Sequence, residues 1–160
     1  MTAMLRIALT ALVLVTLAGC ALKQNPPATR IDLHLTGSDR LNPDLHGRPS
    51  PIVLRLYELK NPVTFEHAEF FSLYQQPQET LALDLIAHEE LELRPGQSQE
   101  LNLLTTAEGT YLGVLAAYRN LPEARWQQVI PLRVGQLNQL YLQLDELGIS
   151  DNDHARAPRN

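Results

Sequence analysis

Cys20 has the most distinctive chemistry in this 160-residue chain, because it is the only cysteine and it closes an apolar run. It follows Leu17, Ala18 and Gly19, and these four residues form the pattern of a lipobox. A lipoprotein signal peptidase needs small side chains at the two positions before the cysteine. The Cys20 thiol would then take a diacylglycerol, and Cys20 would become the first residue of the mature chain. The alternative is an ordinary cleaved signal in which Cys20 has no role.

Residues 1–19 have the parts of a secretory signal peptide. One positive charge, Arg6, precedes an apolar stretch over Ile7–Leu17. At about 11 residues, this stretch is shorter than the roughly 20 that a bilayer-spanning helix needs. Ala21 follows the cysteine, in place of the Asp that commonly retains lipoproteins at the inner membrane. We therefore expect a lipid-anchored protein on the periplasmic face of the outer membrane.

Beyond Cys20, few residues suggest chemistry. The sequence has no nucleophile elbow, phosphate-binding loop or dinucleotide fingerprint. Ser50 lies between two prolines, which favours a rigid loop residue over a nucleophile, and His88 with Glu89 and Glu90 offers at most two metal ligands. No two of the five histidines have metal-ligand spacing: His34, His46, His67, His88 and His154. We therefore predict no enzyme, no metal site and no cofactor other than the covalent lipid on Cys20.

Length and charge indicate one acidic domain. Removing residues 1–19 leaves 141 of 160 residues, which suits a single domain. The mature chain keeps 12 of 13 basic residues and all 18 acidic ones, and 12 − 18 gives a formal net charge of −6. Such a chain has no electrostatic reason to bind nucleic acid. We divide it into a signal peptide (1–19), a lipidated Cys and tether (20–29), a β-sandwich domain (30–148) and a disordered tail (149–160).

The domain begins with two strands that flank a long loop. Apolar residues alternate with polar ones over Arg30–Thr36, which indicates a half-buried strand. Ile52–Leu59 is the second strand, and Arg55 on its mostly apolar face requires a carboxylate partner. Between them, Gly37–Pro51 is rich in proline and short polar residues. Loops of this length in compact domains are usually functional or disordered, and these prolines favour a stiff shape.

A helical insertion follows the second strand. Asn61 and Pro62 are typical of a helix start, and we expect one helix to about Tyr74, then a second short one from Pro77 to about Ile86. Aromatic residues follow the helical period and are predicted to pack against the sandwich, with an exposed docking patch as the alternative: Phe65, Phe70, Phe71 and Tyr74.

Period-two patterns return after the insertion. Glu90–Leu104 is predicted to form a hairpin around a type II turn at Arg94–Gln97. The nearly apolar Tyr111–Tyr118 is typical of a central strand, and a last hairpin is expected around Gly135 from Trp126–Leu132 and Asn138–Leu144. About seven short strands predict a mainly β fold, a two-sheet β-sandwich with a small helical insertion after the second strand.

Several of these stretches resemble the TssJ family, the outer-membrane lipoproteins of type VI secretion systems. The similarity extends from about Arg30 to Leu147. It is carried by the segments Leu41–Pro51, Val53–Leu59, Phe70–Tyr74, Leu93–Gly96 and Tyr111–Arg119.

The resemblance implies a transthyretin-like β-sandwich that helps to assemble the TssJ–TssL–TssM complex across the cell envelope. In the family, the loop after the first strand contacts the periplasmic C-terminal part of TssM. Carried over to this chain, the partner-binding residues are Leu41, Asn42, Pro43, Asp44, Leu45 and Arg48. Two alternatives remain open, a lipoprotein that carries or inhibits through a small-ligand site in the sandwich, and a small envelope hydrolase.

Overall fold

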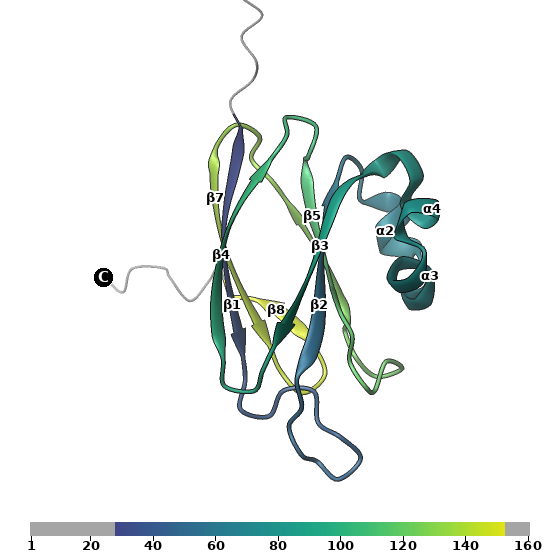
Figure 1. The fold of residues 1–160 in the computed structure, drawn as a ribbon, viewed down its shortest axis with the longest axis vertical. Helices are drawn as coiled ribbons and strands as arrows, with labels where there is room; N and C mark the ends of the chain where they lie inside the picture. The colour runs from purple at the N-terminus through teal and green to yellow at the C-terminus, as the bar shows by residue number, and fades with distance from the viewer. Residues whose placement is uncertain (1–27, 153–160) are drawn as a thin grey trace, which may run out of the picture.

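The computed structural model describes residues 28–152, and the signal peptide, Cys20 and most of the tether lie outside them. Figure 1 shows two facing sheets with a group of short helices against the outer face of one sheet. In chain order, the elements are β1 (Thr29–Gly37), β2 (Ile52–Leu59), α2 (Val63–His67), α3 (Phe70–Gln75), α4 (Pro77–Leu81), the 3-10 turn η1 (Ala82–Asp84), β3 (Leu85–Leu93), β4 (Ser98–Thr105), β5 (Tyr111–Ala116), β6 (Gln127–Pro131), β7 (Leu137–Leu144) and β8 (Ile149–Asp151). None of the described helices is long and apolar enough to cross a membrane.

The two sheets have strand orders β4-β1-β7-β8 and β3-β2-β5-β6. Only the β1–β7 pair is parallel, and the other pairs are antiparallel. Alternate residues of each strand point between the sheets, so Ile31, Leu33 and Leu35 of β1 are buried, as are Leu54 and Leu56 of β2. The predicted two-sheet β-sandwich with a helical insertion after the second strand is confirmed.

The prediction that Glu90–Leu104 forms a hairpin is wrong. β3 pairs with β2 and β4 pairs with β1, so the two strands belong to opposite sheets. The turn itself does form, because the Gln97 amide donates to the Arg94 carbonyl at 3.1 Å and Gly96 has a φ of 71°. It leads the chain from one sheet to the other, and the Gly96 amide bonds to the Gly37 carbonyl at 3.1 Å instead of continuing a ladder.

The predicted hairpin around Gly135 is wrong for the same reason. β6 pairs with β5, and β7 pairs in parallel with β1 in the other sheet. Alternation shows which side chains of a strand face inward, but it is the same for a hairpin and for a connection between facing sheets.

The single helix predicted from Asn61 to Tyr74 is two short helices. Ala68 and Glu69 are extended, with ψ of 147° and 146°. In a continuous helix, five residues rotate the chain so that Phe65 and Phe70 would point about 140° apart. The break lets both rings pack inward, where they are 0% and 8% exposed. The prediction that Phe71 is also buried is wrong, since it is 59% exposed. The second predicted helix, from Pro77 to about Ile86, ends earlier, because α4 stops at Leu81 and β3 begins at Leu85.

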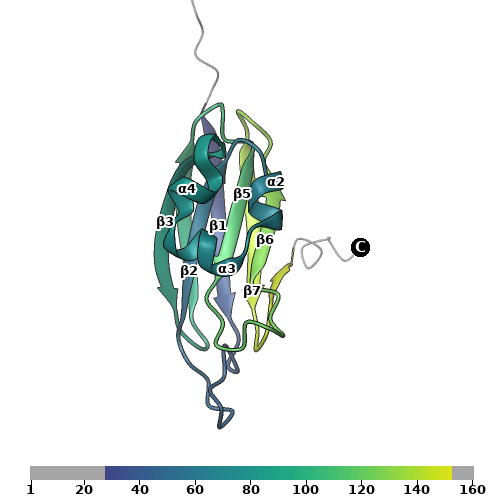
Figure 2. The same ribbon diagram turned by 90° about the vertical axis from the view of Figure 1, so that its right-hand side faces the viewer.

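The insertion packs on the outer face of the β3-β2-β5-β6 sheet, as Figure 2 shows. Apolar side chains of the sheet and the helices form a second core between them. Inside it, the Tyr57 hydroxyl donates to the Leu73 carbonyl at 3.0 Å. The predicted carboxylate partner of Arg55 is Glu90, at 2.7 Å on the neighbouring strand β3. The Arg55 guanidinium also lies 4.0 Å from the Tyr74 ring centroid and donates to the Tyr74 carbonyl, so it ties the end of α3 to the sheet.

The sheet extends past the domain boundary that the sequence predicted at 148/149. Ile149–Asp151 form β8, which pairs with the end of β7, and the Ile149 side chain is 3% exposed. The remainder of the predicted tail, from residue 153, lies outside the described residues.

We predict that Tyr57→Phe lowers the free energy of unfolding by about 1–2 kcal/mol, because it removes a buried hydrogen bond and leaves the Leu73 carbonyl without that donor. Urea unfolding measures the change. Tyr118→Phe is the matched control, because the buried Tyr118 hydroxyl lies near the Gly148 backbone without a hydrogen bond of good geometry among the described residues, and its removal should cost less. Equal losses for the two variants would contradict this role of Tyr57.

Candidate functional site

The β1–β2 loop, residues 38–51, projects from the end of the sandwich opposite the start of β1 (Figure 1). β1 has nine residues, which at about 3.3 Å each separate its ends by roughly 30 Å. Three further connections reach the same end, namely residues 94–97 between β3 and β4, residues 117–126 between β5 and β6, and residues 145–148 between β7 and β8. We call this group of four connections the loop end.

Asn42 holds the base of the long loop. Its side chain is 3% exposed, its Nδ2 donates to the Pro51 carbonyl at 2.9 Å, and its Oδ1 accepts from the Arg119 amide at 2.8 Å. It also has a φ of 45°, which asparagine tolerates better than most residues. One amide side chain thus joins the start of the loop to its end and to the β5–β6 connection.

The tip of the loop closes around the Asp44 carboxylate. Oδ1 accepts from the amides of His46 at 2.8 Å and Arg48 at 3.0 Å, and Oδ2 accepts from the Arg48 guanidinium at 2.8 Å. Gly47, with a φ of 75°, provides the left-handed residue that the turn needs. The hydrogen bonds from the Arg48 backbone and side chain lower the pKa of Asp44 below its ordinary value.

The structure separates the sequence-predicted site residues into two groups. Leu41 is fully buried in the core and Asn42 is nearly so, and these two residues position the loop. Leu45 is fully exposed at the tip and Arg48 is exposed beside it, while Pro43 is partly exposed. Leu45 and Arg48 are therefore the most accessible of the six residues.

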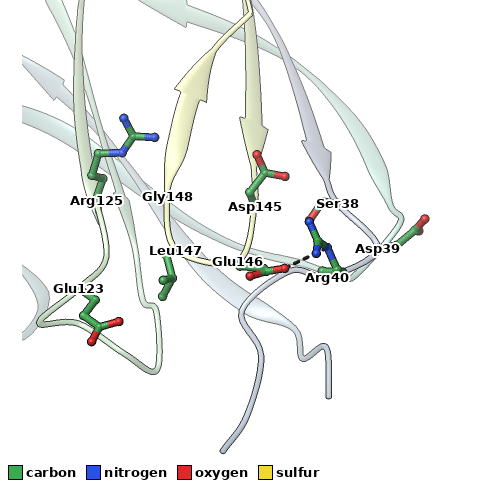
Figure 3. Close-up of a pocket in the computed structure, with 9 residues that line it drawn as sticks. All are labelled: Ser38, Asp39, Arg40, Glu123, Arg125, Asp145, Glu146, Leu147 and Gly148. Carbon is green, nitrogen blue, oxygen red and sulfur yellow. Dashed lines mark ion pairs between the residues drawn. The ribbon is translucent and has the colours of Figure 1, made fainter. Parts of the chain in front are cut away.

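Two grooves flank the β7–β8 turn at the loop end. The first has a volume of about 780 Å³, and its walls come from the long loop and from Arg119, Asn120, Glu146 and Leu147. The second, of about 740 Å³, also has Glu146 and Leu147 in its walls and is shown in Figure 3. There Arg40 points toward Glu146, with 2.9 Å between Nε and Oε1. Acidic and basic side chains both line this second groove: Asp39, Arg40, Glu123, Arg125, Asp145 and Glu146.

The connections at the loop end are bonded to one another. The Arg125 amide donates to the Leu147 carbonyl at 2.8 Å, and the Ile149 amide donates to the Arg125 carbonyl at 3.2 Å. The sequence pattern did not identify the residues 119–125 and 145–148 as part of a site. Only the fold brings the first of these segments beside the long loop.

The other residues considered for chemistry do not assemble into a site. The described residues contain no group of three or more His, Asp or Glu placed to hold a metal ion. His88 stacks on Tyr57 with 6.0 Å between ring centroids, and Ser50 is buried at the loop base, where its hydroxyl donates to the Arg48 carbonyl at 3.3 Å. Cys20 and His154 lie outside the described residues.

Several known proteins share this fold. The chain is 35% identical to the type VI secretion lipoprotein TssJ1 of Pseudomonas aeruginosa, with a TM-score of 0.77 over 78% of this chain and 95% of that one. Lip of Serratia marcescens, a membrane-bound component of the type VI secretion system, is 24% identical over 78% and 96%, with a TM-score of 0.73. A chain in a structure of the TssM C-terminal domain (869–1107) from EAEC is 20% identical over 77% and 97%, with a TM-score of 0.66. No curated protein matches the chain.

The fold and the loop end define a class, a small β-sandwich domain that presents a preformed loop surface. The family model of type VI secretion lipoproteins, described as VasD, EvfM and TssJ, matches residues 29–147. The chain belongs to this family, as the resemblance in its sequence implied.

We predict that the loop tip loosens as the pH falls. The folded pKa of Asp44 is depressed, so its stabilising contribution is complete above the ordinary value of 3.8 and is lost as the pH falls through the lower folded value. NMR titration of the His46 and Arg48 amides should give a midpoint below 3.8. The same amides in Asp44→Asn serve as the control and should not follow that titration. A wild-type midpoint at or above 3.8 would contradict the prediction.

Proposed function

We propose that this lipoprotein is anchored by a lipid on Cys20 in the periplasmic face of the outer membrane, and that its loop end binds the periplasmic C-terminal region of TssM. The lipoprotein associates with TssL only indirectly, within the TssJ–TssL–TssM complex that it helps to assemble. The observation that carries this proposal is the preformed loop with its exposed Leu45, at the end of the sandwich opposite the start of β1.

The position of the two ends supports a linking role. The tether enters at the start of β1, and the long loop leaves at its other end, roughly 30 Å away. A domain held at the membrane through its first end would leave the loop end accessible to a partner in the periplasm. The protein Lip of Serratia marcescens, which has the same fold, is a membrane-bound component of its secretion system.

The bonding within the loop supports a binding role. Asn42 and Asp44 hold the loop in shape without a partner, so binding would require little additional ordering. Leu45 is a large apolar side chain that the domain itself leaves uncovered. An isolated apolar residue on a rigid turn is suited to insertion into a pocket of a partner protein.

The structure from EAEC supports TssM as the partner. The match covers 77% of this 160-residue chain and 97% of the other chain, so that chain is shorter than 160 residues. The TssM segment of that structure, 869–1107, is much longer. A chain with this fold and size thus occurs in a structure of the TssM C-terminal domain.

A small-ligand carrier is less well supported. It requires an apolar cavity in the sandwich, and the opening between the sheets beside Ile31, Leu56 and Leu103 has a volume of about 100 Å³. Small-molecule sites are usually clefts of roughly 300 Å³ or more.

We predict that Leu45→Ser weakens binding to the purified TssM C-terminal region about ten-fold or more, because it removes the apolar anchor at the centre of the contact. Isothermal titration calorimetry measures the dissociation constants. Phe71→Ser is the matched control, since Phe71 is another exposed large apolar residue, on the helical insertion. Unchanged affinity of Leu45→Ser, or an equal loss for Phe71→Ser, would contradict the assignment of the loop.

We predict that Cys20→Ser abolishes metabolic labelling with an alkyne fatty acid and releases the protein from the membrane fraction, because serine offers no thiol for the diacylglycerol. Fluorescent detection of the alkyne and membrane flotation give the two readouts. Ser50→Ala is the control and should keep both the label and the membrane association. A Cys20→Ser protein that still takes up the label would refute the lipobox.

A further inference from the structure

Exposed apolar side chains gather at the end of the sandwich where β1 begins. Leu104 at the end of β4 is 72% exposed, Leu137 at the start of β7 is 50% exposed, and Val134 in the β6–β7 connection is 40% exposed. The strand directions place all three at this end, opposite the loop end. These three side chains lie outside the core and outside the proposed TssM contact.

Strand register places Arg30 between two of these residues. Arg30 of β1 is opposite Leu104 of β4 and opposite Leu137 of β7, so the three side chains form one row on the outer face of the sheet. Their neighbours Ile31, Thr105 and Asn138 are buried, as the alternation requires. The helices cover the other sheet and leave this face open (Figure 1).

A second arginine belongs to the same surface. Arg133 lines a groove together with Leu137 and Asp151, and both Arg30 and Arg133 are exposed and form no ion pair within the described residues. We call this surface the anchor-end patch, made of Arg30, Leu104, Arg133, Val134 and Leu137. Leucine and valine beside unpaired arginines are the composition of a surface that lies in the headgroup region of a bilayer with anionic lipids.

The length of the tether brings this patch to the membrane. Nine residues, 20–28, join the proposed lipidated cysteine to Thr29 in β1, and a chain of nine residues extends at most about 30 Å. The patch is therefore held close to the lipid surface at a high effective concentration, so even weak contacts would be populated.

We propose that the anchor-end patch rests on the phospholipid surface, with Leu104, Val134 and Leu137 among the headgroups and Arg30 and Arg133 bound to anionic lipid phosphates. This inference depends on the proposed lipid anchor at Cys20. The contact would orient the sandwich, so that the loop end points away from the membrane instead of rotating freely about the tether.

The test uses the lipidated full-length protein in vesicles of phosphatidylethanolamine and phosphatidylglycerol in a three-to-one mixture. Leu104→Cys supplies the only reactive thiol, because Cys20 is acylated, and it is labelled with the environment-sensitive fluorophore NBD. We expect blue-shifted emission from position 104, and quenching by lipids that carry a doxyl group near the headgroup. Leu45→Cys, labelled in the same way at the loop end, is the control and should emit as it does in water.

The arginines are tested in the same labelled protein. Replacing Arg30 and Arg133 with Glu should weaken the contact, since one basic residue near an anionic surface contributes about a five-fold effect, so quenching at position 104 should fall. Arg40→Glu, an exposed arginine at the loop end, is the matched control and should leave quenching unchanged.

Flotation of the vesicles separates the two proposals. If the protein floats and position 104 emits as in water, the patch proposal fails while the lipid anchor stands. If position 104 becomes shielded only after the TssM C-terminal region is added, the patch is a protein contact and the lipid proposal is overturned. If the lipidated protein does not float, the anchor fails, and the patch proposal that depends on it fails as well.

Discussion

The pairing of β1 with two neighbours is the constraint on which the rest of this structure depends. β1 is bonded to β4 in antiparallel register and to β7 in parallel register along nearly its whole length. Its inner face supplies Ile31, Leu33 and Leu35 to the core. The same strand connects the tether directly to the long loop, so the two ends of the proposed linkage are joined by one rigid strand inside a sheet.

The second sheet helps to fix the end at which the loop is presented, while its helices build a core of their own. Leu41 enters the core between the sheets, and Asn42 bonds to the chain that follows β5, so the loop is fixed to both sheets. Tyr57, Phe65, Phe70 and Leu73 form a separate core on the outer face, and Arg55 ties the end of α3 to the sheet. That core thickens one sheet and leaves the outer face of the other open, where the anchor-end patch lies.

Local patterns predicted the strands other than β8, their inward faces and the long loop, because side-chain alternation and turn residues depend on short stretches of sequence. The partner of Arg55 was predicted as a carboxylate for the same reason, since a half-buried guanidinium requires one. Strand pairing could not be obtained in this way. The turn at Arg94–Gln97 has the same residues whether it closes a hairpin or crosses to the facing sheet, and the grooves beside residues 119–125 and 145–148 form only when distant connections meet.

The central claim is that this domain meets the membrane at one end and TssM at the other. Site-specific photocrosslinking in intact cells tests it most directly, with benzoylphenylalanine introduced in turn at positions 45, 71 and 104. We expect a TssM adduct from position 45, a phospholipid adduct from position 104, and neither adduct from the lateral position 71. A TssM adduct from position 104 with none from position 45 would contradict the account, because the partner would then bind the end assigned to the membrane.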